Sequence, residues 1–424
     1  MVSWRQKVRE LEEENAFLRA KVEGLERKLL AYENAHTPPS KSKIKPPKKE
    51  SSGKLGAPKG HPKWDRKEPE PTGSVEYVED ACPHCNAKLG KPCKTERILE
   101  EEIPEPQPVE VIEHLINHYI CPKCNKHVVA RNNAPQERFG KNAQTHVTLL
   151  KFEDRLPLRK TMSSLQRHYG LHLTHVGVFN ITNSVARKLI VPYNQFIKRL
   201  RKAKVVYVDE TELKVDGATY HLWTFVTETE TVFAIRKSRG NDVLKEILGE
   251  NYEGIVCCDG WTAYTTYSSN LQRCWAHLLR EAKDLAKKYS NFTGFDEAIK
   301  GIFKKIKKLR EKPFSLKTRE KWKDKLKLEL EQIIEQMNGY KEFREFAGKI
   351  KNGLEHWFTC LIHLFVEPTN NNAERALREL IVQRKIIGGL RREKGARIME
   401  VITSVIATTK IRQQPLFQTI KSYL

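Results

Sequence analysis

Apolar residues recur every seven positions along the first stretch of the chain. One register holds Trp4, Leu11, Leu18, Leu25 and Tyr32, and the other holds Val8, Asn15, Val22 and Leu29. This heptad pattern predicts a coiled coil over residues 1–36, and an asparagine in the apolar seam favours a parallel homodimer in fixed register. A single amphipathic helix packed against its own domain is the alternative.

The apolar pattern then stops for about one tenth of the chain. Residues 37–72 are rich in Pro, Lys, Ser and Gly, and such a composition cannot bury enough apolar surface to fold. We expect a basic flexible linker that lies along a DNA backbone, or else a solvated connector. Residues 73–135 follow, with strand-like stretches around 95–103 and 109–120 that are expected of a zinc ribbon.

A helical, basic pattern covers residues 136–200 and is interrupted at Tyr169-Gly170. Short helices around such a break are typical of a helix-turn-helix-like DNA-binding region. Its groove helix is predicted over residues 174–188, where Asn180, Asn183 and Arg187 are candidate DNA contacts. An ordinary helical connector would give the same pattern.

The next segments alternate in a way that predicts an α/β core. Strands are expected at residues 205–209, 220–226, 232–236 and 254–258, with a helix at 242–248. This order matches an RNase H-like fold, in which the first and fourth strands lie side by side. Residues 201–295 and 356–424 would form the catalytic core, and the lysine-rich residues 296–355, broken at Pro313, a helical insertion. The predicted class is therefore multidomain α+β.

Charge narrows the choice of partner. The 424 residues include 76 Lys+Arg against 53 Asp+Glu, a formal net charge of +23, which favours nucleic acid over an anionic membrane surface. There is no apolar run of about eighteen residues and no signal-like N-terminus. We therefore expect a cytoplasmic, nucleoid-associated protein without a membrane partner.

The cysteines indicate a metal site rather than a disulfide framework. Their number is nine, which is odd, and four of them form the pairs Cys82-Pro-His-Cys85 and Cys121-Pro-Lys-Cys124. Paired thiolates at this spacing complete a tetrahedral Zn²⁺ site that stabilises a small fold and leaves no open catalytic position. A substitute for one thiolate could come from His84, Cys93 or His127.

Three carboxylates are candidates for divalent-metal chemistry. Asp209 and Asp259 each end an apolar strand, and Glu374 follows Asn370-Asn-Asn-Ala at a predicted helix start. Carboxylate oxygens suit Mg²⁺ or Mn²⁺, and a two-metal site activates a water or a 3′-hydroxyl for phosphodiester chemistry. Taken alone, each aspartate is more typical of a turn or a helix cap, and the glutamate of a helix-dipole contact. Nearby competing acids are Glu210, Glu212, Asp216 and Glu367.

Several motifs together resemble the insertion sequence 66 family of DDE transposases. They are Gly60-His-Pro, the two Cys-Pro-x-Cys pairs, Val208-Asp209-Glu-Thr, Asp259-Gly-Trp-x-Ala-Tyr264, Cys274-Trp-Ala-His-Leu-Leu-Arg280 and Asn371-Asn-Ala-Glu-Arg-Ala-Leu-Arg378. The resemblance implies that Asp209, Asp259 and Glu374 are the catalytic triad with magnesium as cofactor. It also implies that the DNA substrates are the terminal inverted repeats of an insertion element and a target duplex.

Other residues are candidate DNA contacts. The resemblance favours His277 and Arg280 as active-site neighbours that contact DNA phosphates, with a simple basic helix face as the alternative. A second zinc at Cys274 and His277 is less favoured than packing. Trp261 is a candidate to stack an unpaired base, although a Trp after a strand is more often core. A basic stripe around Glu374, suited to gripping phosphates, consists of Arg375, Arg378, Arg384 and Lys385.

These observations predict a transposase that binds terminal inverted repeats and catalyses metal-dependent cleavage and strand transfer. It would act as a homodimer or larger assembly, with accessory proteins of the same element as further partners. Two alternatives stay open: an element-derived DNA-binding regulator that does not cut, and a plain RNase H-like nuclease. Joining of a cut end to a second duplex distinguishes a transposase from both.

Overall fold

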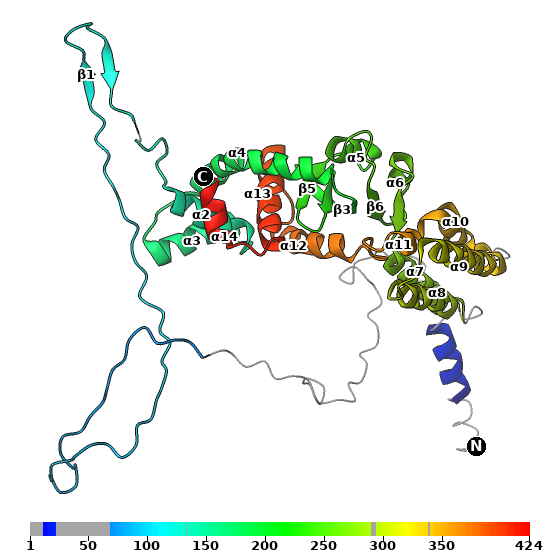
Figure 1. Ribbon diagram of the computed structural model, residues 1–424, viewed down its shortest axis with the longest axis horizontal. Coiled ribbons are helices and arrows are strands. Elements are labelled where there is room, and N and C mark those ends of the chain that lie inside the picture. The colour runs from blue at the N-terminus through cyan, green and yellow to red at the C-terminus, as the bar shows by residue number, and fades with distance from the viewer. Residues whose placement is uncertain (1–11, 23–67, 133, 290–293, 338–339) are drawn as a thin grey trace, which may run out of the picture. The chain divides into compact units, whose positions relative to one another are not determined.

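The computed structural model shown in Figure 1 describes residues 12–22, 68–132, 134–289, 294–337 and 340–424. The chain divides into one unit of residues 1–44 and 108–424 and a second unit of residues 45–107. Residues 12–22 form a helix, within the segment where the heptads predict one. The other coiled-coil positions, and the predicted linker up to residue 67, lie outside the described residues.

The region predicted as a ribbon contains fewer strands than its pattern suggested. Strand β1 (His118–Ile120) pairs antiparallel with β2 (His127–Val129). No strand is assigned at residues 95–103, so that prediction was wrong. The adjoining residues 104–108 contain Pro104, Pro106 and Pro108, and since proline has no N–H to donate, this stretch is a poor partner for a ladder.

Three helices occupy residues 141–200, as the pattern predicted. They are α2 (Lys141–Phe152), α3 (Leu158–Tyr169) and α4 (His175–Leu200). Gly170 ends α3 with φ of 60°, a backbone conformation that glycine adopts without a steric cost. Thr174 caps α4 by accepting a hydrogen bond of 3.0 Å from the Gly177 N–H. Helix α4 runs twelve residues beyond the predicted 174–188 because its buried face continues to Leu200.

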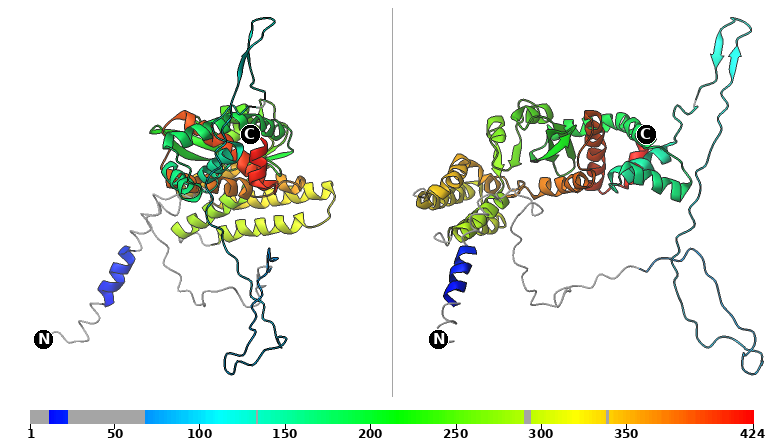
Figure 2. Two further views of the ribbon diagram at one scale, coloured as in Figure 1. Left: turned by 90° about the vertical axis from the view of Figure 1, so that its left-hand side faces the viewer. Right: turned by 180° about the vertical axis from the view of Figure 1, so that it is seen from behind.

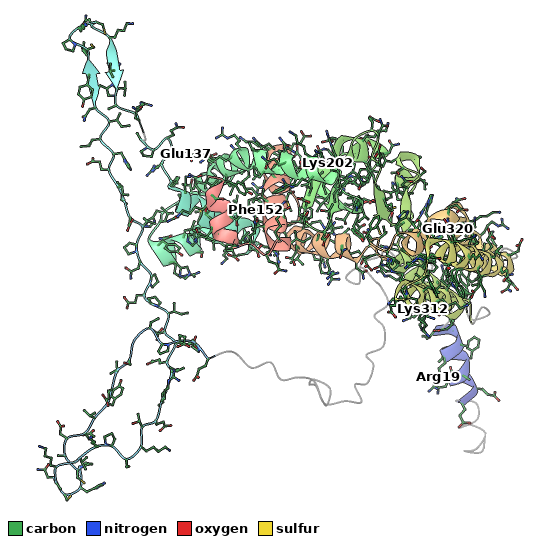
Figure 3. The ribbon with its side chains drawn as sticks, in the orientation of Figure 1. Arg19, Glu137, Phe152, Lys202, Lys312 and Glu320 are labelled. Carbon is green, nitrogen blue, oxygen red and sulfur yellow. The ribbon has the colours of Figure 1, made fainter. Side chains whose placement is uncertain are left out.

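Glu137 fastens the segment before α2 to helix α4. Its carboxylate, labelled in Figure 3, accepts hydrogen bonds from Gln144 at 2.7 Å and Lys188 at 2.5 Å, and also from Ser184. These bonds lower the pKa of Glu137, with Lys188 as the largest contributor. Ser184 and Lys188 are therefore engaged within the protein, whereas Asn180 and Arg187 of the same helix are exposed.

One mixed sheet forms the centre of the larger unit, in the order β5-β4-β3-β6-β7. Strand β3 pairs antiparallel with β4 and parallel with β6, which confirms that the first and fourth predicted strands are neighbours. Helices α5 (Asn241–Leu248) and α6 (Thr262–Tyr267) flank β6 in sequence. The strands are β3 (Val205–Val215), β4 (Ala218–Val226), β5 (Thr231–Arg236), β6 (Ile255–Cys258) and β7 (Leu271–Arg273).

Side-chain alternation along β3 gives the sheet two apolar faces. Val206 and Val208 pack in one core with residues of α4, α5 and α13 (Glu393–Ile411). Tyr207 points to the other face and packs with Ala373 of α12 (Asn371–Ile387). Because side chains alternate along a strand, successive β3 residues face different helices. The last helix, α14 (Leu416–Ser422), packs against α2 and α13.

Helix α13 covers the edge strand β5 with hydrogen bonds as well as apolar contacts. The backbone N–H groups of Thr231, Phe233 and Ile235 donate to side chains of α13. Their acceptors are Thr408 at 3.0 Å, Ser404 at 2.8 Å and Glu400 at 3.1 Å. The acceptors are four residues apart on α13, and the donors are two residues apart on β5. These outward-facing N–H groups of the edge strand therefore have hydrogen-bond partners.

The predicted insertion is helical and has its own core. It contains α8 (Phe295–Arg310), α9 (Leu316–Met337) and α10 (Arg344–Asn352), and the break at Pro313 lies between α8 and α9. With α7 (Trp275–Lys288) and α11 (Thr359–Ile362), these helices gather at one end of the sheet in Figures 1 and 2. Trp275 Nε1 and Gln272 Nε2 both donate to Trp357 O, at 2.6 and 3.3 Å, and tie β7 to the insertion.

Two short 3₁₀ turns complete the insertion, η1 (Lys341–Phe343) and η2 (Leu354–His356). Apolar residues of α7, α8, α9 and α10 form this second core, separate from the core between α4 and the sheet. In the described part of the chain, none of the helices is both long enough and apolar enough to span a membrane.

Candidate active site

Asp209 and Asp259 lie at corresponding positions on neighbouring parallel strands. Tyr207 of β3 pairs with Cys257 of β6, and each aspartate follows two residues later. Asp209 Oδ1 accepts the N–H of Glu210 at 3.0 Å, and Asp259 Oδ1 accepts the N–H of Trp261 at 2.9 Å. The parallel register therefore brings the first two predicted acids to the same level of the sheet, where β6 ends. We call this part of the sheet, at Asp209 and Asp259, the carboxylate edge.

Asp209 and Glu210 leave β3 in opposite directions because they are adjacent residues of one strand. Glu210 lies toward α6, where it accepts hydrogen bonds from the Tyr264 hydroxyl and, at 2.8 Å, from Arg239. Its side chain is only 2% exposed. The sequence alone named Glu210 merely as a competitor of Asp209, whereas in the fold it is a buried acid with its own cation.

Asn370 fixes the start of α12 against the aspartates. Its side-chain Nδ2 donates to the Val208 carbonyl at 2.7 Å, and its backbone N–H donates to Cys274 Sγ at 3.1 Å. The Glu374 N–H in turn bonds the Asn370 carbonyl at 3.1 Å, in the first turn of the helix. Since Val208 directly precedes Asp209, this contact fixes the first turn of α12, which carries Glu374, to the strand that carries Asp209.

The carboxylates of this edge interact electrostatically. Burial raises the pKa of Asp209 well above its ordinary value, and the negative charges of Glu210, Asp259 and Glu374 raise it further. Burial and the charge of Asp259 likewise raise the pKa of Glu210. Clustered acids of this kind are costly to ionise without a cation.

His277 and Arg280 of α7 face Glu374. Glu374 Oε1 lies 3.5 Å from His277 Nε2, and Glu374 Oε2 lies 3.8 Å from Arg280. Glu374 Oε1 is buried and accepts no hydrogen bond from any described residue. His277 and Arg280, which the resemblance linked to DNA phosphates, are therefore placed to hold the third carboxylate.

Cys274 completes a compact trio with these groups. One ligand atom each of Cys274, His277 and Glu374 lies within 4.8 Å of the others, which makes this the closest group of metal-donor types among the described residues. However, burial raises the pKa of the Cys274 thiol, and zinc needs the thiolate. Cys274 is instead used as the acceptor for the start of α12, which favours the packing role over a second zinc site.

The basic residues of α12 have different surroundings. Arg375 and Arg378 are exposed near Glu374, and Arg375 donates to Asn372 at 3.2 Å. Arg384 donates to Thr211 Oγ1 at 3.1 Å and fastens α12 to β3. Ten residues of helix separate Arg384 from Glu374, which is about 15 Å, so Arg384 and the exposed Lys385 lie well away from the carboxylates.

The candidate contacts of α4 lie on a helix that packs on the opposite face of the sheet from α12. Arg187 is exposed and Asn183 is half-buried. Val185 and Leu189, between and beyond them, are fully buried in the core shared with the sheet. The structure does not bring Asn183 or Arg187 to the carboxylate edge.

Three residues at the site carried no chemical signal of their own in the sequence. Asn370 is fully buried, and its only sequence mark is the run of amides before Glu374. Tyr264 belongs to the Asp259-Gly-Trp-x-Ala-Tyr motif, but its bond to Glu210 requires the folded sheet. Arg239 follows β5 in an unremarkable polar stretch, and nothing there indicated a carboxylate partner.

Each Cys-Pro-x-Cys pair forms the same turn within its own unit. Cys82 O accepts the N–H of Asn86 at 2.8 Å, and Cys121 O accepts the N–H of Asn125 at 2.8 Å. Both asparagines have positive φ, 58° and 52°. Backbone N–H groups, first those of His84 and of Cys124 respectively, lower the pKa of the Cys82 and Cys121 thiols. Each turn thus favours the thiolate that zinc binds.

The donor set at the sheet edge fits a divalent cation. Burial, and then the like charges of Glu210, Asp259 and Glu374, raise the pKa of Asp209, and the Glu374 Oε1 atom is buried without a hydrogen-bond donor among the described residues. A hard cation such as Mg²⁺ takes carboxylate oxygens as ligands and neutralises such a cluster. Asp209, Asp259 and Glu374 are the residues that would hold it.

Comparison with known proteins identifies a family for this chain. A protein-family model described as "Transposase IS66 family" matches residues 136–398. A search of curated proteins finds no match. The matched span begins just before α2, contains the whole sheet and the insertion, and includes all three predicted catalytic acids.

Proposed function

Because this chain belongs to the IS66 family of transposases, we propose that it binds the ends of an insertion element and catalyses DNA cleavage and strand transfer at Asp209, Asp259 and Glu374. The observation that carries the proposal is the gathering of these acids, from two parallel strands and one helix start, at a single edge of the sheet. Burial, and then the charges of Glu210, Asp259 and Glu374, raise the pKa of Asp209.

The order of strands supports an RNase H-like assignment for this core. In the observed sheet β3 has β4 on one side and the parallel strand β6 on the other, with α12 across one face. In this arrangement β3 carries Asp209, Asp259 directly follows β6, and α12 carries Glu374. The lysine-rich helices α8 to α10 enter between Asp259 and Glu374 in sequence, yet the charges of both acids help to raise the pKa of Asp209.

Bound Mg²⁺ or Mn²⁺ would activate a water molecule or the 3′-hydroxyl of the DNA as the nucleophile, and would stabilise the leaving oxygen. Asp209, Asp259 and Glu374 would hold the cations. His277 and Arg280 orient Glu374 from α7, and Asn370 fixes the helix that carries it. The exposed Arg375 and Arg378 are placed to position a DNA phosphate beside Glu374.

DNA recognition falls to other parts of the chain. The net charge of +23 favours a polyanion, and the exposed Asn180 and Arg187 of α4 remain candidate contacts, with Asn183 between them. We assign the zinc module, the basic linker and the N-terminal heptads to end recognition and dimerisation. Accessory proteins of the same element would join the assembly.

The test is strand cleavage and joining on a duplex that carries the element's own terminal repeat, with Mg²⁺ present. Glu374→Gln should reduce cleavage by at least about 100-fold, because losing a metal ligand exceeds the loss seen for groups that merely support one. DNA binding should persist. Glu379→Gln, on the exposed face of the same helix, is the matched control and should cut normally.

The two alternative functions give different results in this assay. If the chain is a DNA-binding regulator, the natural protein and Glu374→Gln should both bind the repeat. Neither should cut it, even when the neighbouring gene products are added. A plain nuclease would cut but never join the cut end to a second duplex. The half-buried acids, whose like charges help to raise the pKa of Asp209, favour an active enzyme over the regulator, since a binding protein has no need to keep such a costly cluster.

A further inference from the structure

Trp261 is exposed beside the candidate active site. It follows Asp259 by two residues, and its N–H donates to Asp259 Oδ1 at 2.9 Å. Its side chain is 39% exposed, although a large aromatic residue after a strand usually enters the core. The fold thus leaves an indole in contact with solvent next to an acid assigned to the metal.

The indole is held rigidly rather than left free. Its Nε1 donates to the Arg239 carbonyl at 3.2 Å, and the Arg239 guanidinium lies 4.0 Å from the ring centroid. The same guanidinium donates to Glu210 Oε1 at 3.0 and 2.8 Å. Glu210 is itself buried between strand and helix. A chain of contacts therefore fixes the indole to the carboxylate cluster.

A fixed, solvent-exposed indole has a defined use in nucleic-acid chemistry. Stacking a base on an aromatic side chain contributes about 1–3 kcal/mol and needs no particular base. A ring that is already immobile loses little conformational freedom on binding. A base within a duplex is already stacked on both sides, so only an end base or one turned out of the helix can reach such a ring.

We propose that Trp261, positioned by Arg239, is a stacking platform for a base unpaired from the DNA strand beside the reacting phosphate. This inference rests on the proposed function, because it places the phosphate at Asp259. A nucleobase fits better than a protein partner, since the exposed ring lies next to the metal-binding acids, where the DNA strand itself must pass.

Photo-crosslinking tests the contact directly. Duplexes of the element's terminal repeat carry 5-iodouracil at single positions around the end, and are irradiated with the full-length protein in the Glu374→Gln background, which prevents cutting. We expect one position to crosslink to the peptide that contains Trp261. Trp261→Tyr should retain the crosslink, and Trp261→Ala should lose it while still binding DNA.

A control aromatic lies elsewhere on the same unit. Phe365 is 50% exposed and lines a cavity with Ala203 and Gly254, which precede β3 and β6 at the ends away from the carboxylates. Phe365→Ala should leave the crosslink unchanged. If irradiation labels Phe365 or scattered residues as strongly as Trp261, the platform assignment is wrong.

Cleavage kinetics supply the second readout, in protein with Glu374 intact. Trp261→Ala should slow cleavage of a fully paired end by about 5- to 150-fold, the equivalent of the stacking free energy. A mismatch at the crosslinked position should restore most of the rate, because unpairing no longer depends on the stack. A loss that the mismatch leaves unchanged, without a crosslink, would mean that Trp261 is merely structural.

The outcomes for the two proposals are separable. Suppose that Trp261 crosslinks to the DNA, but protein with Glu374 intact never cuts it, even when the neighbouring gene products are added. This result supports the platform and overturns the transposase proposal. Normal cleavage by Trp261→Ala without a crosslink overturns the platform and leaves the transposase intact. A change of oligomeric state in Trp261→Ala, again without a crosslink, would identify a second copy of the chain as the partner and also overturn the platform.

Discussion

Individual acids at the sheet edge are held in a state that is unfavourable without a cation. Burial, and then the charges of Glu210, Asp259 and Glu374, raise the pKa of Asp209. A raised pKa in the folded state means that the stabilising contribution is present below the ordinary pKa of Asp, about 3.9, and is lost as the pH rises. Near neutral pH, the metal-free protein should therefore be destabilised by Asp209.

Asp209→Asn should accordingly raise the Tm of the metal-free protein at pH 7, by about 2 °C or more. Mg²⁺ should raise the Tm of the natural protein and have a smaller effect on the variant. Differential scanning calorimetry with EDTA and with Mg²⁺ measures both effects. Asp284→Asn, at an exposed position on α7, should change neither value. A fall in Tm for Asp209→Asn would show that the carboxylate is stabilising as it stands.

Glu230 shows the opposite electrostatic behaviour. Burial raises its pKa, but hydrogen bonds from Thr229, Arg199 and Arg412 outweigh burial and lower it. A lowered pKa contributes stability above the ordinary value of Glu, about 4.3, and that stability is lost as the pH falls through the folded-state value. Arg199 is 43% exposed, so solvent screens part of this interaction.

Glu230→Gln should therefore reduce the free energy of unfolding at pH 7 by about 1–3 kcal/mol. The difference between the two proteins should begin to shrink as the pH falls below about 4.3, where Glu230 of the unfolded chain takes up a proton, and it should shrink until the folded protein is protonated as well. Urea unfolding at pH 7 and at pH 3.5 measures it. If the two proteins differ in free energy of unfolding by the same amount at both pH values, the electrostatic explanation is wrong. The effect of the substitution would then come from side-chain packing alone.

At the scale of elements, α13 and β5 depend on side-chain hydrogen bonds across a sheet edge. Thr408 Oγ1 accepts the Thr231 N–H at 3.0 Å and donates to the Thr231 carbonyl at 2.9 Å. Thr409 is equally buried, but its hydroxyl donates only to Val405 O within the helix. The two neighbouring threonines thus differ in one respect, the contact with the strand.

Thr408→Val should lower the free energy of unfolding by about 1–3 kcal/mol, because it leaves a buried N–H without an acceptor. Thr409→Val keeps the same shape and should cost less than about 1 kcal/mol, since the helix carbonyl retains its backbone partner. Equilibrium unfolding of both variants gives the comparison. Similar losses for the two would mean that helix packing alone, and not edge bonding, holds α13 on β5.

At the scale of the whole molecule, the two cysteine knuckles are predicted to share one structural zinc. None of the four cysteines belongs to the apolar cores of the described sheet region. Removing zinc should therefore unfold the predicted zinc-binding region, residues 73–135, and weaken DNA binding. The catalytic core should keep its structure.

Metal analysis should find one zinc per chain in the natural protein. Cys82→Ser and Cys121→Ser should each reduce the zinc content to below about half, because a tetrahedral site needs all of its ligands. Cys93→Ser, at an exposed cysteine between the knuckles, should keep the full amount. Loss of zinc from Cys93→Ser, with retention in Cys121→Ser, would replace the four-cysteine assignment by another ligand set.

Short sequence patterns specify the local features of this protein. Apolar strands that end in Asp209 and Asp259, the amide-rich start of the helix with Glu374, and the helix break at Gly170 are all visible as short patterns. They follow from side-chain periodicity and from backbone preference over a few residues. The strand expected at residues 95–103 failed because a strand also needs a partner, which its own sequence does not specify.

The contacts between groups that are distant in sequence depend on the folded arrangement of the elements. This arrangement brought His277 Nε2 and Arg280 to 3.5 and 3.8 Å from the Glu374 carboxylate, and it paired Glu210 with Arg239. It also left Trp261 in solvent, against the usual expectation for its position. Such contacts depend on how whole elements pack, through bonds like that of Asn370 to Val208. The periodicity of each element encodes its buried face but not the identity of the residue that covers that face.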